Sequence, residues 1–420
     1  MKSKYILSLV SPLLIGLPLK AERPLLKDST LRIDYIFSGN ARHQEISVKE
    51  LITYEGWAGR THHMDSIALK GNGQITMKNA KTHEILYCNS FSTLFQEWLG
   101  TEEATKTSKA FENVFLLPMP QDTAIVEIKI QDFKQQTIAE LNHMVAPEDI
   151  LIRPIKKTSA PHRYLKKSPL GKNAIDIAIV AEGYTEAEMP DFYKHAEEAT
   201  EALFSYEPYK KYENRFNVVA VGAVSQESGV SIPSQNIWKE TALNSHFDTF
   251  YSDRYLTTLH LSQLHDALAG IPYEHIIILA NTENYGGGGI FNSYTLTASR
   301  HSTFRPVVVH EFGHSFAGLA DEYYYDDQFV EYYYPDIEPW EQNITTLKEF
   351  DKKWKDLLPE DYDYSNKEQD IEPGLFEGGG YQSKGVYRGC KDCRMKTNEA
   401  KEFCPICQRT IERLIRFYTE

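Results

Sequence analysis

The most informative segment of this 420-residue chain reads Val307-Val-Val-His-Glu-Phe-Gly-His-Ser-Phe-Ala317. It is largely apolar and stops before Gly318, so we predict a buried helix that ends at this glycine. Within it, His310, Glu311 and His314 form an H-E-x-x-H pattern. Because positions i and i+4 lie on one face of a helix, both imidazoles can point at one zinc ion, while the adjacent carboxylate reaches a water at its open position. The pattern predicts a catalytic zinc site with Glu311 as general base.

A catalytic zinc needs a third protein ligand. Asp321 and Glu322 follow Gly318 closely, where a turn can fold a carboxylate back toward the metal. We predict Asp321 as the third ligand. Two alternatives stay open: Asp321 caps a helix or lies in a solvated turn, or Glu322 is the ligand or accepts a hydrogen bond from an imidazole.

The sequence around this segment indicates an α/β domain over residues 173–420. Strand-like and helix-like segments alternate there, with apolar strands predicted at residues 175–180, 216–221 and 275–280 and a helix over 186–206. The glycine-rich segment 284–291 is predicted to be an edge strand that pairs with a substrate backbone, or else a flexible turn. The acidic, tyrosine-rich segment 323–334 is predicted to be a loop near the cleft, a solvated surface or a calcium-binding turn.

The first third of the chain has a different pattern. Apolar and polar residues alternate in short segments such as 31–37, 67–69 and 124–130, separated by turn residues. This is typical of an all-β sandwich, which we place at residues 22–155. Residues 156–172 break the alternation with seven Lys, Arg or His residues and two prolines, and we predict a linker there.

The N-terminus has the composition of an export signal. Lys2 and Lys4 precede an apolar stretch over residues 5–19, which is short for a bilayer span and contains Pro12 and Pro18. We predict a cleaved signal peptide over residues 1–21 and an extracytoplasmic location, periplasmic or secreted, with no stable membrane insertion after cleavage. An uncleaved membrane anchor is the alternative. The formal net charge of −14 argues against nucleic-acid binding by bulk charge.

Four of the five cysteines form two C-x-x-C pairs. These are Cys390 with Cys393 and Cys404 with Cys407. The spacing suits a structural zinc held by four thiolates, whereas in an exported protein two disulfides are the competing prediction. Cys88 is left over in either case, and we expect it to be a buried apolar residue.

The run His310-Glu-Phe-Gly-His-Ser-Phe-Ala-Gly-Leu-Ala-Asp-Glu-Tyr323 resembles the zinc signature of the bacterial IgA-peptidase family of metzincin-like metallopeptidases. Segments 181–184, 376–381, 385–388, 393–396 and 403–407 agree with the same family. The resemblance implies a β-sandwich domain followed by a zinc peptidase domain. It also implies a secreted zinc endopeptidase that acts on proteins or peptides. The family label suggests host immunoglobulin as a partner, although no residue here encodes that choice.

The resemblance also gives roles to two further residues. Met395 resembles the methionine of the turn beneath the metal in metzincins, and Tyr387 is placed as a residue that stabilises the oxyanion, with ordinary packing as its alternative role. Metzincin relatives with a second, structural metal beside that turn favour zinc at the cysteines. The chain departs from the wider metzincin pattern because Gly318 and Asp321 each come one position later after His314, and because Asp replaces His.

Two other functions fit parts of the sequence. One is an adhesin that binds a glycan or a protein and keeps the zinc fold only as a scaffold. The other is a zinc hydrolase of non-peptide bonds, since water activation does not depend on the carbonyl attacked. Glu311 argues against the first, because a scaffold has no physical need for that carboxylate.

Overall fold

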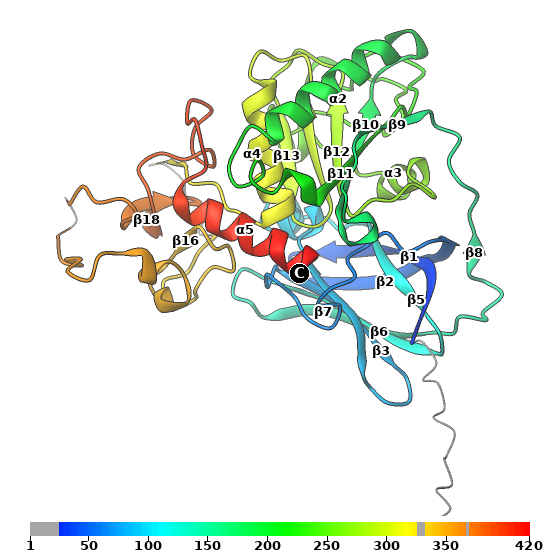
Figure 1. Cartoon of the computed structure of the whole chain (residues 1–420), viewed down its shortest axis with the longest axis horizontal. Coiled ribbons are helices and arrows are strands. Elements are labelled where there is room, and N and C mark those ends of the chain that lie inside the picture. The colour runs from blue at the N-terminus through cyan, green and yellow to red at the C-terminus, as the bar shows by residue number, and fades with distance from the viewer. Residues whose placement is uncertain (1–24, 326–331, 367–368) are drawn as a thin grey trace, which may run out of the picture.

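The computed structural model in Figure 1 describes residues 25–325, 332–366 and 369–420. The predicted signal peptide at residues 1–21 lies outside these ranges, as does part of the tyrosine-rich segment 323–334. The chain is a mixed structure with more strands than helices. Every helix in the described ranges is too short or too polar to cross a bilayer.

Two four-stranded sheets make up most of the N-terminal region. The first has the order β5-β1-β2-β8 and the second the order β4-β3-β6-β7. Predicted strands 31–37 and 124–130 are confirmed within β1 and β6, and β6 alternates strictly between buried and half-buried residues. The strands are β1 Leu26–Asn40, β2 His43–Glu55, β3 Gly73–Asn79, β4 Ile85–Phe91, β5 Lys109–Pro120, β6 Ala124–Gln131, β7 Thr137–Val145 and β8 Arg153–Pro154.

Two details of this region differ from the prediction. Residues 67–69 do not form a strand, and the carbonyl of Leu69 accepts a hydrogen bond from the Ser90 hydroxyl at 2.5 Å rather than from the backbone of a neighbouring strand. The region is also not purely β. Helix α1 (Leu94–Leu99) follows β4, and Thr93 caps it by accepting from the backbone N–H of Gln96.

A six-stranded sheet with the order β13-β14-β12-β10-β11-β9 is the centre of the second region. Its four inner strands are parallel and its two edge strands are antiparallel to their neighbours. All three predicted strands are confirmed, as is the predicted helix after the first of them. The strands are β9 His162–Lys166, β10 Ile175–Glu182, β11 Phe216–Val221, β12 His275–Ala280, β13 Gly287–Ile290 and β14 Tyr294–Ala298.

The two faces of this sheet are covered differently. Ile177 and Ile179 of β10 pack in one core with helices α2 (Met189–Leu203), α4 (Phe304–Ala317) and α5 (Pro405–Thr419). Ala178 and Val180, on the opposite face, share a core with the N-terminal sheets and with α3 (Leu261–Ala267). The alternation of side chains along a strand therefore places the N-terminal region against one face of the central sheet and three helices against the other (Figure 1).

Residues 156–172, predicted as a linker, contain an element of the central sheet. Strand β9 pairs antiparallel with β11 and forms one edge of the sheet. Pro161 and Pro169 flank the five-residue strand, and an edge position tolerates its Arg and Lys side chains. The composition that suggests a linker is thus also that of a short edge strand.

A fourth sheet of the described residues is formed by strands that lie between α4 and α5 in the sequence. Strand β18 (Tyr381–Arg388) is its centre and pairs with β15 (Tyr324–Tyr325), β16 (Ile344–Thr345) and β17 (Phe376–Gly379). After β18 the chain runs through the C-x-x-C pairs into α5. Figure 1 shows β16, β18 and α5 on the side of the molecule next to α4.

Candidate active site

Helix α4 carries the H-E-x-x-H residues, as predicted. It ends at Ala317, and Gly318 adopts the left-handed conformation with φ of 56°. The backbone N–H of Gly318 donates to the carbonyl of His314, and that of Leu319 donates to the carbonyl of Gly313. This glycine cap reverses the chain and returns Asp321 to the helix face that carries the histidines.

The three predicted metal ligands converge on one point. His310 Nε2 lies 3.0 Å from His314 Nε2 and 3.0 Å from Asp321 Oδ1, and His314 Nε2 lies 3.3 Å from the same oxygen. Ligands about 2.0–2.1 Å from a tetrahedral zinc ion lie roughly 3.3–3.4 Å from one another, which is close to this spacing. Asp321 Oδ1 is buried and has no hydrogen-bond partner within the described residues. The donor set and the unpartnered oxygen fit a divalent cation.

Backbone carbonyls orient both imidazoles. His310 Nδ1 donates to the carbonyl of Arg394 at 2.9 Å, and His314 Nδ1 donates to the carbonyl of Leu319 at 2.6 Å. With Nδ1 protonated, each Nε2 presents its lone pair to the common point, the arrangement that metal-ligating histidines use. The two side chains are 13% and 16% exposed, so the group is reachable from one side.

The ionisable side chains of His310, His314 and Asp321 together favour binding of a cation. Burial opposes ionisation of Asp321, but His314 and His310 outweigh it and hold the pKa of Asp321 below its ordinary range. Burial likewise opposes protonation of His314, yet Asp321 raises its pKa to about 9. The site therefore attracts positive charge, which a metal ion supplies when it displaces the protons.

Glu311 faces the glycine-rich strand β13. A Cβ atom added to Gly287 would lie 3.0 Å from Glu311 Oε1, and one added to Gly289 would lie 2.7 Å from the Cβ of His314. The glycines thus let α4 pack directly on β13. Burial raises the pKa of Glu311 above its ordinary value, which brings the carboxylate toward the range useful for a general base.

Strand β13 is an edge strand, as predicted, but its outer side already has partners. Tyr255 forms a parallel bridge with Gly287. At the other end, Ser92 and Phe291 are joined by two hydrogen bonds, one through the Ser92 hydroxyl and one through its backbone N–H. The geometry gives no support to the idea that a substrate pairs along the whole of this strand.

Met395 lies beneath the helix that carries the histidines. It is fully buried, and a Cβ atom added to Gly313 would come 2.7 Å from its sulfur. Its backbone carbonyl accepts a hydrogen bond from the N–H of Glu322 at 2.8 Å. Met395 therefore packs against α4 and binds the segment that brings Asp321 back to the histidines of this helix.

Comparison with known protein families agrees with this geometry. The family described as IgA Peptidase M64 matches residues 164–369 and 361–415, and the family described as Peptidase M64 N-terminus matches residues 23–142. The chain belongs to the IgA peptidase M64 family. It is therefore a metallopeptidase, which hydrolyses peptide bonds in proteins or peptides. No curated protein matches the sequence closely enough to add to this assignment.

In this M64 peptidase, Tyr381 rather than Tyr387 contacts Asp321, one of the predicted metal ligands. The Tyr381 hydroxyl donates to Asp321 Oδ2, and its backbone has an uncommon φ of 67°. Tyr387 lies farther along β18, opposite Thr345 and Glu377, and within the described ranges no hydrogen bond joins it to the metal ligands. Sequence reasoning missed Tyr381, although it follows three glycines in a segment that resembles the family.

The N-terminal region of the M64 peptidase adds an acidic residue, Glu97, to the site. Glu97 is on α1, its side chain is exposed, and it accepts a hydrogen bond from the Tyr255 hydroxyl. Although the residue is exposed, the surrounding protein partly desolvates its carboxyl group and raises its pKa to about 7, and the charges of Asp321 and Glu311 add to the rise. No sequence motif indicates a role for Glu97, because its position near the site depends on how α1 packs beside β13.

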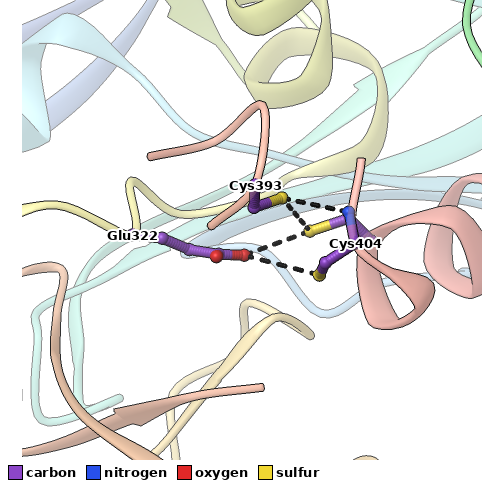
Figure 2. A group of neighbouring side chains, drawn as sticks. Glu322, Cys393 and Cys404 are labelled. Carbon is purple, nitrogen blue, oxygen red and sulfur yellow. Dashed lines mark hydrogen bonds between the residues drawn. The ribbon is translucent and has the colours of Figure 1, made fainter. Parts of the chain in front are cut away.

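Glu322 does not join the catalytic group. Its carboxylate faces three cysteines instead, and the ligand atoms of Glu322, Cys393, Cys404 and Cys407 lie within 4.8 Å of one another (Figure 2). Cys390 is buried and its thiol contacts that of Cys404, but it is not among the four residues whose ligand atoms converge, so the converging set has Glu322 in place of the expected fourth thiolate. All five cysteines are free thiols, and Cys88 is buried as predicted.

Proposed function

We propose that this metallopeptidase is a zinc-dependent endopeptidase with Glu311 as its general base. The observation that carries the proposal is the convergence of His310, His314 and Asp321 around one point, with the Glu311 carboxylate on the same helix. Two imidazole nitrogens and one carboxylate oxygen are a ligand set typical of catalytic zinc, which keeps a fourth position open. The partial exposure of both histidines supports access for water and substrate.

The residues around the metal have separable roles. A zinc ion held there would lower the pKa of a bound water toward about 7 and polarise the substrate carbonyl. Glu311 accepts the proton of the attacking water and donates it to the leaving amine. Asp321 is held in place by the Tyr381 hydroxyl. Tyr387 lies on β18, and the oxyanion-stabilising role predicted for it from the sequence stays a prediction.

The experiment is hydrolysis of casein and of peptides blocked at both ends by the purified full chain. We expect cleavage of both, complete loss with a chelator, and recovery when zinc is returned. Cleavage that requires a free terminus would refute the endopeptidase proposal, and activity that survives removal of the metal would refute the metal's role. A panel of ester and non-peptide amide substrates tests the broader hydrolase alternative.

We also propose that the N-terminal sheets form a β-sandwich and that the catalytic region is metzincin-like. The common core of the two four-stranded sheets supports the first. The placement of Met395 beneath the histidine-bearing helix supports the second. The two regions correspond to the proposed domains at residues 22–155 and 173–420.

Export from the cytoplasm is proposed from the sequence alone. Lys2, Lys4 and the apolar stretch over residues 5–19 support a signal peptide cleaved after residue 21. N-terminal sequencing of the protein from the extracytoplasmic fraction tests this. Host immunoglobulin is one proposed substrate among proteins, and direct digestion of purified immunoglobulin A tests it.

A further inference from the structure

A second group of side chains that could bind a metal lies next to the first in the chain, since Asp321 and Glu322 are consecutive residues. Glu322 comes from the segment that follows α4, Cys393 from the turn before α5, and Cys404 and Cys407 from the start of α5 (Figure 2). All four residues are at least 95% buried. Three separate parts of the chain thus deliver one carboxylate and three thiols to a site closed to solvent.

The distances within this group match those around a bound metal. Cys393 Sγ lies 3.7 Å from Cys407 Sγ, and Glu322 Oε1 lies 3.2 Å from Cys407 Sγ and 3.9 Å from Cys404 Sγ. With Zn–S of about 2.3 Å and Zn–O of about 2.0 Å, tetrahedral geometry places two sulfurs roughly 3.8 Å apart and a sulfur and an oxygen roughly 3.5 Å apart. The sulfurs are far beyond the ~2.05 Å of a disulfide.

The group also holds an unpartnered buried oxygen. Asn343 donates to Glu322 Oε1 at 3.0 Å, but Glu322 Oε2 is buried without a hydrogen-bond partner among the described residues. The backbone N–H of Cys404 donates to the sulfur of Cys393 at 3.2 Å, which holds that sulfur in place within the group. A buried carboxylate with an unpartnered oxygen is costly unless a cation compensates its charge.

We propose that Glu322, Cys393, Cys404 and Cys407 bind a second divalent metal ion. Thiolates select zinc over calcium or magnesium, and four protein ligands in a closed site indicate a structural rather than a catalytic ion. Glu322 replaces the fourth thiolate that the cysteine spacing suggests. The inference stands independently of the proposed peptidase mechanism, because it rests on a different set of residues.

This metal site is linked to the catalytic group through two short segments. Asp321 and Glu322 are neighbours in the chain and belong to the two different groups. In the other segment, Cys393 is a ligand of the second group, Arg394 accepts the hydrogen bond from His310, and the carbonyl of Met395 accepts from the N–H of Glu322. The second metal therefore positions residues that hold the first.

Metal analysis of the full chain and four variants tests the proposal. We expect about two zinc ions per wild-type chain, about one in His314→Ala, and about one in Cys407→Ser and in Glu322→Gln. Cys390→Ser should keep about two, because Cys390 contacts Cys404 but lies outside the converging group. Replacement of zinc by cobalt gives a second readout. The thiolate-to-cobalt charge-transfer band should persist in His314→Ala and weaken in Cys407→Ser.

The outcomes separate this inference from the proposed function. A single zinc that is lost in His314→Ala and kept in Cys407→Ser would overturn the second site and leave the catalytic site intact. A single zinc with the opposite dependence would overturn the catalytic site instead. Loss in Cys390→Ser but not in Glu322→Gln would refute Glu322 as a ligand. If Cys407→Ser does not fold, the wild-type protein provides the test. A thiolate-to-cobalt band and five reactive thiols in denaturant would support the second metal site, whereas two disulfides would leave only Cys88 reactive and would refute it.

Discussion

Asp321 and Glu322 are consecutive residues whose carboxylates face two different groups of metal-binding side chains. Asp321 Oδ1 lies 3.0 Å from His310 Nε2, and Glu322 Oε1 lies 3.2 Å from Cys407 Sγ. Each of the two carboxylates has one buried oxygen without a hydrogen-bond partner in the described ranges. One dipeptide therefore joins the proposed catalytic site to the proposed second metal site.

Substitution of Glu311 should separate metal binding from catalysis. Glu311→Gln removes the proton acceptor but none of the three converging ligand atoms. We expect hydrolysis of casein to fall by about 10²-fold or more, the scale of general acid–base catalysis, while zinc content stays near that of the wild type. Activity assays and metal analysis on the same preparation measure both quantities.

The matched control for this variant is Glu197→Gln, an exposed carboxylate on α2 that forms an ion pair with Arg163. It should leave both activity and zinc content unchanged. Near-normal hydrolysis by Glu311→Gln would show that another group takes the proton.

Substitutions of Tyr381 and of Tyr387 should affect zinc affinity differently. The hydroxyl of Tyr381 donates to Asp321, so Tyr381→Phe leaves that ligand less well oriented and should weaken zinc affinity about 10- to 100-fold. Tyr387→Phe should leave zinc affinity unchanged. Competition with a chromogenic chelator measures the affinities. A loss of kcat in Tyr387→Phe at full zinc occupancy would instead restore the catalytic role predicted for it from the sequence.

The parts of the site that the sequence predicts are those encoded locally. Helix α4 and its glycine cap follow from a run of apolar residues and one Gly, and the i, i+4 spacing alone brings the two histidines together. Asp321 is predictable because only a short turn separates it from the helix. Three inner strands of the central sheet, β10, β11 and β12, are likewise largely apolar runs bounded by turn residues.

The missed residues reach the site through pairing of distant segments. Tyr381 depends on the register of β18 against β15, and Glu97 depends on the docking of α1 beside β13. The group of Glu322 and three cysteines likewise depends on contacts between segments that are distant in the sequence. The C-x-x-C spacing indicates Cys390 as a metal ligand because it considers residues of one segment alone. It gives no indication that another segment supplies a carboxylate such as Glu322.

Glu97 should influence which peptides are cleaved. It is an exposed carboxylate near Glu311 and Asp321, so a cationic substrate group beside it is favoured. Glu97→Gln should lower kcat/KM about 3- to 10-fold for a peptide with Lys or Arg near the cleaved bond, the scale of about 1 kcal/mol expected for exposed charges. For a neutral peptide, kcat/KM should change little.

Two measurements control the Glu97 prediction. Zinc content should be the same in Glu97→Gln and in the wild type, because Glu97 is not among the converging ligands. The effect on the cationic peptide should also shrink in high salt, which screens exposed charges. An equal loss for cationic and neutral peptides would point to a general distortion of the site rather than to charge recognition.

Asp176 should make the stability of the fold depend on pH. It is a buried residue of β10, and desolvation raises its pKa to about 6 despite a hydrogen bond from Asn217. A carboxyl group whose pKa is higher in the folded state stabilises the protein below its unfolded pKa, and this stability is lost as the pH rises through the folded value. The window therefore runs from about pH 4 to about pH 6, and the loss is of the order of 3 kcal/mol.

The variant Asp176→Asn removes this ionisation and keeps an oxygen that can accept from Asn217. Its advantage in the free energy of unfolding over the wild type should grow between pH 4 and pH 6 and then stay constant to pH 8. Denaturant titrations at each pH measure this difference. Burial raises the pKa of Glu274, and the charge of Asp176 adds to the rise, so the comparison is made with Glu274→Gln in both proteins to isolate Asp176. A difference that is the same at every pH would mean that Asp176 ionises as readily in the folded chain as in the unfolded one.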